Sequence, residues 1–127
     1  MNRVHSEENY TIDHDGGRNL FVFTWSQATR SMGEERFRDG CSRNAELTEV
    51  HHPRACVVDL RDFQHRPADT FAAWQTANIN PRYATAGLQR LAFIHSGAYP
   101  LPPDAKGDYE TRNFVDADEA TAWATSE

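Results

Sequence analysis

The side chains best suited to chemistry lie close together in one short stretch of the chain, from Asp59 to His65. Two carboxylates, Asp59 and Asp62, precede His65, and one hypothesis is an enzyme that uses these three groups. His65 could instead join Arg61 and Arg66 in recognising an anion. The plainer alternative is a solvated loop whose carboxylates cap helix ends or pair with the arginines, because no further residue stands at ligand or triad spacing.

These residues follow an apolar run that predicts the central strand of the fold. Residues 55–63 read Ala-Cys-Val-Val-Asp-Leu-Arg-Asp-Phe, and turn-forming residues border them on both sides, which favours a strand over a buried helix. A strand that is apolar on both faces needs cover on both. A second apolar run, residues 91–94, follows a helical segment, so the pattern predicts an α/β domain. Such sheets bind ligands outside the carboxyl ends of their strands, where Asp59 and Asp62 stand.

The N-terminal half predicts a hairpin followed by a long helix. Strand-like residues 10–13 and 20–25 flank an Asp-Gly-Gly turn. Aromatic side chains share one face of the second strand, and we expect that face to meet a helix layer. A charged, helix-favouring segment begins at Ser31, its expected N-cap, and Glu34 would complete a capping box. Gly40 weakens this helix, so close packing against the sheet is its expected role.

The C-terminal half predicts further helices and a last strand. Pro67 suits the first turn of a helix, residues 80–81 break that helix, and Gly87 ends the part that resumes. The remaining predicted segments are a Pro- and Gly-rich loop over 96–109, a short strand over 110–114 and an acid-capped helix over 116–123.

Composition narrows the class of protein and its partners. The 127 residues fit one ordinary domain, and the net charge of −6 argues against unspecific attraction to phosphate, so we expect no nucleic-acid partner. No apolar stretch approaches the roughly 20 residues of a membrane span, and the polar start does not resemble a signal peptide. We therefore expect a cytoplasmic protein. Cys41 and Cys56 are expected as small buried residues in a reducing compartment.

Three stretches of the chain together resemble the STAS/SpoIIAA-like family, which shares the fold of the anti-sigma-factor antagonists. They are residues 55–63, residues 86–94 and residues 109–123, the last being a strand ending in phenylalanine followed by an acid-capped helix with Ala and Trp. The resemblance implies a single STAS/SpoIIAA-like domain over residues 1–127. Its mixed sheet would have about five strands, with the chain order ββαβαβα and helices packed on it. These are packing motifs, so they bear on fold more than on function.

The resemblance also suggests a regulatory role. In the anti-sigma-factor antagonists, a serine at the start of the helix after the central strand accepts a phosphate and switches partner binding. Residues 64–70 hold no serine here, and Thr70 is the only hydroxyl among them. Thr70 could take a phosphate at a helix N-terminus, or it could be an ordinary first-turn residue. The implied function is a non-catalytic regulatory or protein-interaction module that lacks the usual phospho-acceptor serine and binds a protein partner.

A second hypothesis is a carrier or sensor for a small apolar or anionic ligand held between the helices and the sheet. Aromatic residues could line a cavity there or simply fill the core: Trp25, Phe71, Trp74, Tyr83, Phe93 and Trp123. The residues singled out for partner or ligand binding are Asp59, Asp62, His65, Arg66, Thr70, Trp74 and Tyr83. A homodimer could form if the hairpin of residues 10–25 or the strand over 110–114 lies at a sheet edge.

No motif of established chemistry occurs in the chain. His51 and His52 are adjacent, so they lack the i, i+4 spacing of helical metal ligands. HExxH, CxxC, GxSxG and glycine-rich phosphate-binding patterns are all missing from the sequence. We therefore expect no metal, no cofactor and no catalytic residue, and a protein that is not an enzyme.

Overall fold

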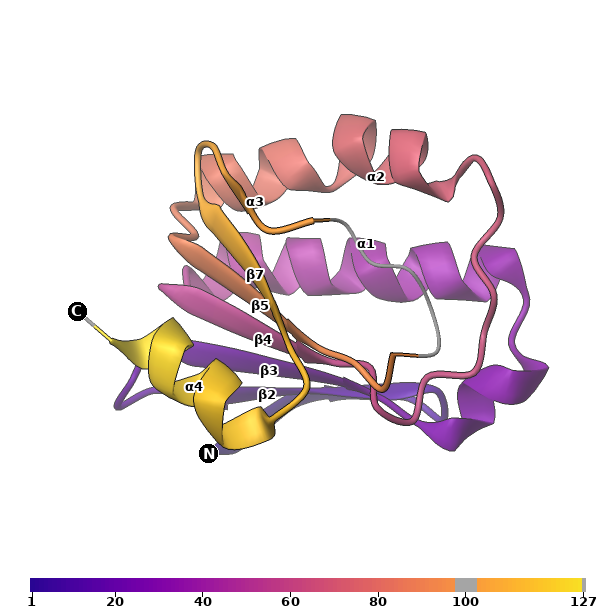
Figure 1. Ribbon diagram of the computed structural model, residues 1–127, viewed down its shortest axis with the longest axis horizontal. Coiled ribbons are helices and arrows are strands. Elements are labelled where there is room, and N and C mark those ends of the chain that lie inside the picture. The colour runs from indigo at the N-terminus through magenta and orange to yellow at the C-terminus, as the bar shows by residue number, and fades with distance from the viewer. Residues whose placement is uncertain (98–102, 127) are drawn as a thin grey trace.

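The computed structural model describes residues 1–97 and 103–126, which build an α/β fold around one mixed seven-stranded sheet (Figure 1). Its strands are β1 (Asn2–Ser6), β2 (Tyr10–Asp15), β3 (Leu20–Trp25), β4 (Ala55–Asp59), β5 (Arg90–Ile94), β6 (Ala105–Lys106) and β7 (Glu110–Phe114). They are ordered β1-β2-β3-β4-β5-β7-β6 across the sheet. The four strands β3, β4, β5 and β7 run parallel, whereas β1 and β6 join the sheet antiparallel at its two ends, and β2 pairs antiparallel with β3. The predicted α/β class with a mixed sheet is confirmed.

Helices cover both faces of the sheet (Figure 1). One face carries α1 (Glu34–His51), α2 (Phe71–Asn78) and α3 (Asn80–Ala86), and the other carries α4 (Ala117–Thr125). A 3₁₀ helix, η1 (Gln27–Ser31), precedes α1. The chain crosses from β3 to β4 through α1 and from β4 to β5 through α2 and α3, as parallel pairing requires. In the described part of the chain, no helix has the length and apolar character needed to cross a membrane.

The central strand β4 is buried on both faces, as its sequence predicts. Cys56 and Val58 pack in a core beneath α1, α2 and α3, and Ala55 and Val57 pack in a second core beneath α4. The alternation follows from the two-residue period of a strand. Both cysteines are buried and free, and burial raises the pKa of Cys41 and Cys56 well above that of an ordinary thiol.

The aromatic face of β3 meets α1, and Gly40 permits the contact. The Trp25 ring is 1% exposed, and a Cβ atom added to Gly40 would lie 2.5 Å from Trp25 Cη2. Tyr10 Cε1 would lie 3.1 Å from the same added atom. The predicted role of Gly40 in close packing against the sheet is confirmed.

The sheet has two more strands than the predicted number of about five. The first addition, β1, lies within the polar N-terminal residues, and the second, β6, has only two residues. Both are terminal strands of the sheet and bury little apolar surface, so the sequence carries no alternating pattern for them. Part of the predicted loop over 96–109, residues 98–102, lies outside the described residues.

Two predicted helix starts are wrong, and tertiary contacts explain the first. Gly33 is the N-cap of α1, whereas Ser31 ends η1, so Ser31 and Glu34 form no capping box. The Glu34 carboxylate instead binds groups far along the chain. Pro67 precedes α2, which begins only at Phe71.

Other predicted boundaries are confirmed. The break near residue 80 falls at Ile79, between α2 and α3, and Pro81 lies in the first turn of α3. Gly87 ends α3 with a φ of +91°, a backbone conformation that favours glycine. Asp116 caps α4, because its Oδ2 accepts a 2.9 Å hydrogen bond from the Glu119 N–H.

Both predicted sheet edges are wrong. The strand over 110–114, β7, lies between β5 and β6, and the hairpin of β2 and β3 is covered by β1. The outermost strands of the described sheet are therefore β1 and β6. The register of β1 shifts between Arg3 and His5, an irregularity of the kind that discourages pairing with another chain.

Candidate functional site

The predicted trio of Asp59, Asp62 and His65 does not act as one cluster. Asp59, at the end of β4, holds Arg61 in a two-pronged ion pair, with Nη2 2.7 Å from Oδ2 and Nε 3.0 Å from Oδ1. Burial raises the pKa of the Asp59 carboxyl, but the hydrogen bonds from Arg61 outweigh it and leave the pKa lowered. Asp62 and Arg66 are exposed to solvent.

His65 turns inward from its loop and contacts the start of α1. Its ring is 9% exposed and packs against the Phe37 ring, with 4.9 Å between the ring centres. Nδ1 lies 3.1 Å from the Met32 carbonyl oxygen, and Nε2 lies 2.9 Å from Glu34 Oε1. The histidine therefore ties the 64–70 segment to the N-terminal end of α1.

Glu34 is the centre of these contacts. Its Oε1 accepts a hydrogen bond of 2.9 Å from the Ala68 N–H as well as facing His65, and its Oε2 accepts one of 2.8 Å from Arg38 Nε. Burial raises the pKa of the Glu34 carboxyl, but these three hydrogen bonds together hold it below its ordinary value.

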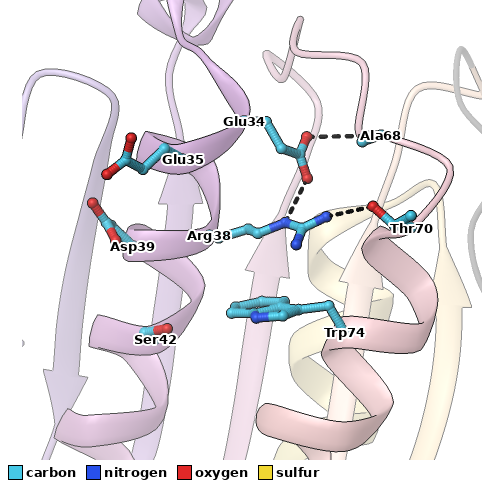
Figure 2. A pocket seen from close by; sticks show the side chains of 8 residues that line it. All are labelled: Glu34, Glu35, Arg38, Asp39, Ser42, Ala68, Thr70 and Trp74. Carbon is cyan, nitrogen blue, oxygen red and sulfur yellow. Dashed lines mark hydrogen bonds and ion pairs between the residues drawn. The ribbon is translucent and has the colours of Figure 1, made fainter.

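Arg38 extends the same contacts to α2, as Figure 2 shows. Its Nη2 donates a 2.9 Å hydrogen bond to Thr70 Oγ1, and its guanidinium carbon lies 5.2 Å from the centre of the Trp74 ring. Beneath them, the Phe71 ring lies 4.6 Å from the Phe37 ring, centre to centre. We call the set that joins α1 to the 64–70 segment and to α2 the Glu34 network: Glu34, Arg38, His65, Thr70 and the Ala68 N–H.

A shallow, open groove lies above this network, between α1 and α2 (Figure 2). We call it the α1–α2 groove, and its lining residues are Glu34, Glu35, Arg38, Asp39, Ser42, Ala68, Thr70 and Trp74. Glu35 and Asp39 point from the side of α1 that faces away from α2. Neither carboxylate forms a hydrogen bond or ion pair with any residue of 1–97 or 103–126. The rim of the groove is therefore acidic.

Six of the seven predicted binding residues lie in or near the 59–74 region and fall into three places. Thr70 and Trp74 line the groove, and His65 supports it from beneath through Glu34. Asp59, Asp62 and Arg66 lie outside the groove lining. The sequence interpretation did not single out Arg38, and it gave Glu34 only a capping role. The i, i+4 spacing of Glu34 and Arg38 is visible in the sequence, but their partners in the 64–70 segment lie more than 30 positions away.

Tyr83 is a core residue of α3. Its hydroxyl accepts a 2.7 Å hydrogen bond from Asn44 Nδ2, and both side chains are buried. Burial, the largest influence, raises the pKa of Tyr83 well above that of an ordinary tyrosine. The arrangement stabilises the contact of α1 with α3 and gives Tyr83 no access to a ligand at the surface.

The six aromatic residues that could line a cavity or fill the core are divided between the two faces of the sheet. Trp123 packs with the core beneath α4, whereas the other five belong to the core beneath α1, α2 and α3. There the Trp25 ring packs on the rings of Phe23, Phe37 and Phe63, with centres 4.8, 5.3 and 5.7 Å apart. Trp25 is therefore part of a filled core.

In the described part of the chain, no group of three or more His, Cys, Asp or Glu side chains is placed to hold a metal ion. Comparison with protein-family models, curated proteins and solved structures found no match to this chain. The fold and the site define an α/β domain with helices on both faces of a mixed sheet. Its most developed polar feature is the Glu34 network beneath the α1–α2 groove.

The lowered pKa of Glu34 predicts a specific loss of stability in acid. Because the folded state holds the carboxylate, its contribution is complete above the ordinary titration range of glutamate and is lost as the pH falls through the lower, folded-state value. We expect Glu34→Gln to lower the free energy of unfolding at neutral pH by about 1–3 kcal/mol. Below about pH 4 the difference from wild type should shrink.

Urea unfolding at a series of pH values measures this difference. Glu35→Gln is the matched control, because the neighbouring carboxylate lacks a hydrogen-bonding partner among the described residues and should leave the pH profile of wild type unchanged. Equal pH profiles for Glu34→Gln and wild type would show that the Glu34 network contributes nothing as an ionised group.

Proposed function

We propose that this protein is a non-catalytic interaction module, of the STAS-like regulatory type, that binds a protein partner on α2 and the α1–α2 groove. The observation that carries the proposal is the surface of α2. No charged residue occurs from position 70 to position 81, although charged residues make up 25% of the chain. Yet no side chain of α2 is fully buried, and five of its eight residues are exposed.

A charge-free surface helix suits the centre of an interface. Charged residues are depleted from the buried centre of protein interfaces, whereas Trp and Arg are enriched there. Ala72, Ala73 and Ala77 are exposed on α2, and half-buried Trp74 leans from α2 toward α1 (Figure 2). Arg38 already holds Trp74 in place, which lowers the entropy cost of ordering that side chain on binding.

The charges beside α2 indicate the chemistry of the partner. Glu35 and Asp39 leave an acidic rim along the α1–α2 groove, and the chain as a whole carries a net charge of −6. A complementary surface would place a lysine or arginine against this rim and small apolar side chains against α2. A module of the STAS-like class would use the helix that follows the central strand, and α2 is that helix.

The test adds one charge at the centre of the proposed interface. Ala73→Glu changes an exposed alanine of α2, and Ala122→Glu makes the same change at an exposed alanine of α4, on the opposite face of the sheet. Wild type and both variants are cross-linked in extract of the source cell, and captured proteins are quantified by mass spectrometry. We expect a basic partner that wild type and Ala122→Glu capture equally and Ala73→Glu captures at least about tenfold less.

Reversal of the rim charges gives a second measurement. Glu35→Lys and Asp39→Lys should each weaken binding of that partner, and more strongly at low ionic strength, because exposed charges are screened by salt. Capture of the same proteins in equal amounts by wild type and Ala73→Glu would reject this surface as the binding site.

A further inference from the structure

The two ring nitrogens of His65 both face hydrogen-bond acceptors. Nδ1 faces the Met32 carbonyl oxygen at 3.1 Å, and Nε2 faces Glu34 Oε1 at 2.9 Å. A neutral imidazole has one N–H donor and one lone pair, so it can satisfy only one of these contacts. The second contact would then set a nitrogen lone pair against an oxygen. Because burial, which raises the pKa of Glu34, is outweighed by hydrogen bonds that lower it, the Glu34 oxygen is a carboxylate acceptor. Only the imidazolium ion, with two N–H donors, therefore satisfies both contacts.

We infer that His65 is a protonation-dependent latch that fastens the 64–70 segment, and with it the start of α2, to the N-terminal end of α1. In the protonated state, His65 bridges the Met32 carbonyl and the Glu34 carboxylate. Loss of the proton breaks one of these bonds and loosens the segment. The latch itself stands on this geometry, and only its consequence for partner binding rests on the proposed function.

The groups around the ring define when the latch is closed. From α1, the Glu34 carboxylate faces the ring directly, and Arg38 reaches it only through the other carboxylate oxygen. The rings of the described residues that pack against His65 are those of Phe37 and Phe63, at 4.9 and 6.0 Å between centres. Among the described residues, Glu34 is the one carboxylate that forms an ion pair with the His65 ring.

Two titrations limit the closed state. The lower limit is the protonation of Glu34. Burial raises the pKa of this carboxyl, but its hydrogen bonds outweigh burial and leave the pKa below its ordinary value. The upper limit is the loss of a proton from the His65 ring, which leaves one of its two nitrogens without a donor. The latch is thus closed between these two limits and opens when the ring becomes neutral.

Opening changes the proposed binding surface without unfolding the core. The Ala68 N–H and Thr70 are held through Glu34 and Arg38, and both line the α1–α2 groove. When His65 no longer fastens their segment, these groups and the first turn of α2 lose part of their fixed position. We expect partner affinity to fall as the latch opens, because more groups must then be ordered on binding.

Nuclear magnetic resonance of the ¹⁵N-labelled full chain tests the latch without any partner. In the closed latch, both ring nitrogens of His65 carry protons, and their chemical shifts report this state. When a rise in pH makes the ring neutral, the hydrogen-exchange protection of the Ala68 amide should fall about tenfold. His65→Gln should show low protection of Ala68 throughout, whereas His95→Gln should behave as wild type.

Two results would overturn the latch. One is a His65 ring that is neutral throughout the pH range in which the protein is folded, and the other is a ring that loses its proton while the protection of Ala68 stays constant. If His65→Gln does not fold, the wild-type titration alone still decides between these outcomes. A protein that shows the latch but binds no partner at any pH would reject the proposed function and leave this inference standing.

Discussion

Phe37→Ala is expected to lower the free energy of unfolding by about 3–5 kcal/mol, the range for a large aromatic residue removed from a core. Phe37 is 5% exposed and contacts the core and the candidate site at once. Its ring lies 5.3 Å from the Trp25 ring, 4.6 Å from the Phe71 ring of α2 and 4.9 Å from the ring of His65, centre to centre. Urea unfolding followed by circular dichroism measures the loss.

The same substitution should loosen α2 more than it loosens the central strands of the sheet. Phe71 packs on Phe37, so the cavity left by the smaller side chain should let the amides of α2 exchange earlier than those of the central strands. Phe114→Ala is the matched control, because Phe114 packs with Trp123 in the core beneath α4 and should leave α2 protected. A loss of less than about 1 kcal/mol for Phe37→Ala would contradict the described packing.

Gly40→Ala is expected to destabilise the protein by about 1–3 kcal/mol, although alanine is the better helix former. Replacing glycine by alanine inside a helix gains up to about 1 kcal/mol when there is room for the methyl group. Here the new Cβ would lie 2.5 Å from Trp25 Cη2. The indole ring is buried among other aromatic rings and cannot move aside cheaply, so overpacking outweighs the gain in helix propensity.

Thermal and urea unfolding of the variant measure this balance. Gly107→Ala is the control, because nothing lies within 4 Å of its added Cβ and its backbone is not in the left-handed region. We expect it to change stability by less than about 0.5 kcal/mol. Increased stability of Gly40→Ala would contradict this prediction, because it would show that α1 can shift away from β3 and make room for the methyl group.

Part of the groove lining was singled out from the sequence. Thr70 was predicted because the family resemblance places a phospho-acceptor at the start of the helix after the central strand, and Trp74 because it is one of the aromatic residues that could line a cavity. Both line the α1–α2 groove. Glu34 was misread as a capping residue, and Arg38 was not singled out. Their roles depend on the 64–70 segment lying over the start of α1, and local patterns do not encode that approach.

The aromatic residues show the same limit. The composition predicts buried aromatic rings, and Trp25 and Trp123 are both packed against cores. Nothing in the spacing assigns them to opposite faces of the sheet. The face that Trp123 covers depends on where α4 returns to the sheet, after β7 has paired beside β5.

The sequence by itself determined the features that follow from side-chain period, side-chain size or backbone freedom. These features are the apolar strand β4, the turn before β3, the close packing at Gly40 and the end of α3 at Gly87. Only the tertiary structure decided that Glu34 faces a histidine more than 30 positions away. Such a contact forms only when the fold of the sheet brings two distant segments of the chain together. It therefore stabilises the protein only after the chain has folded.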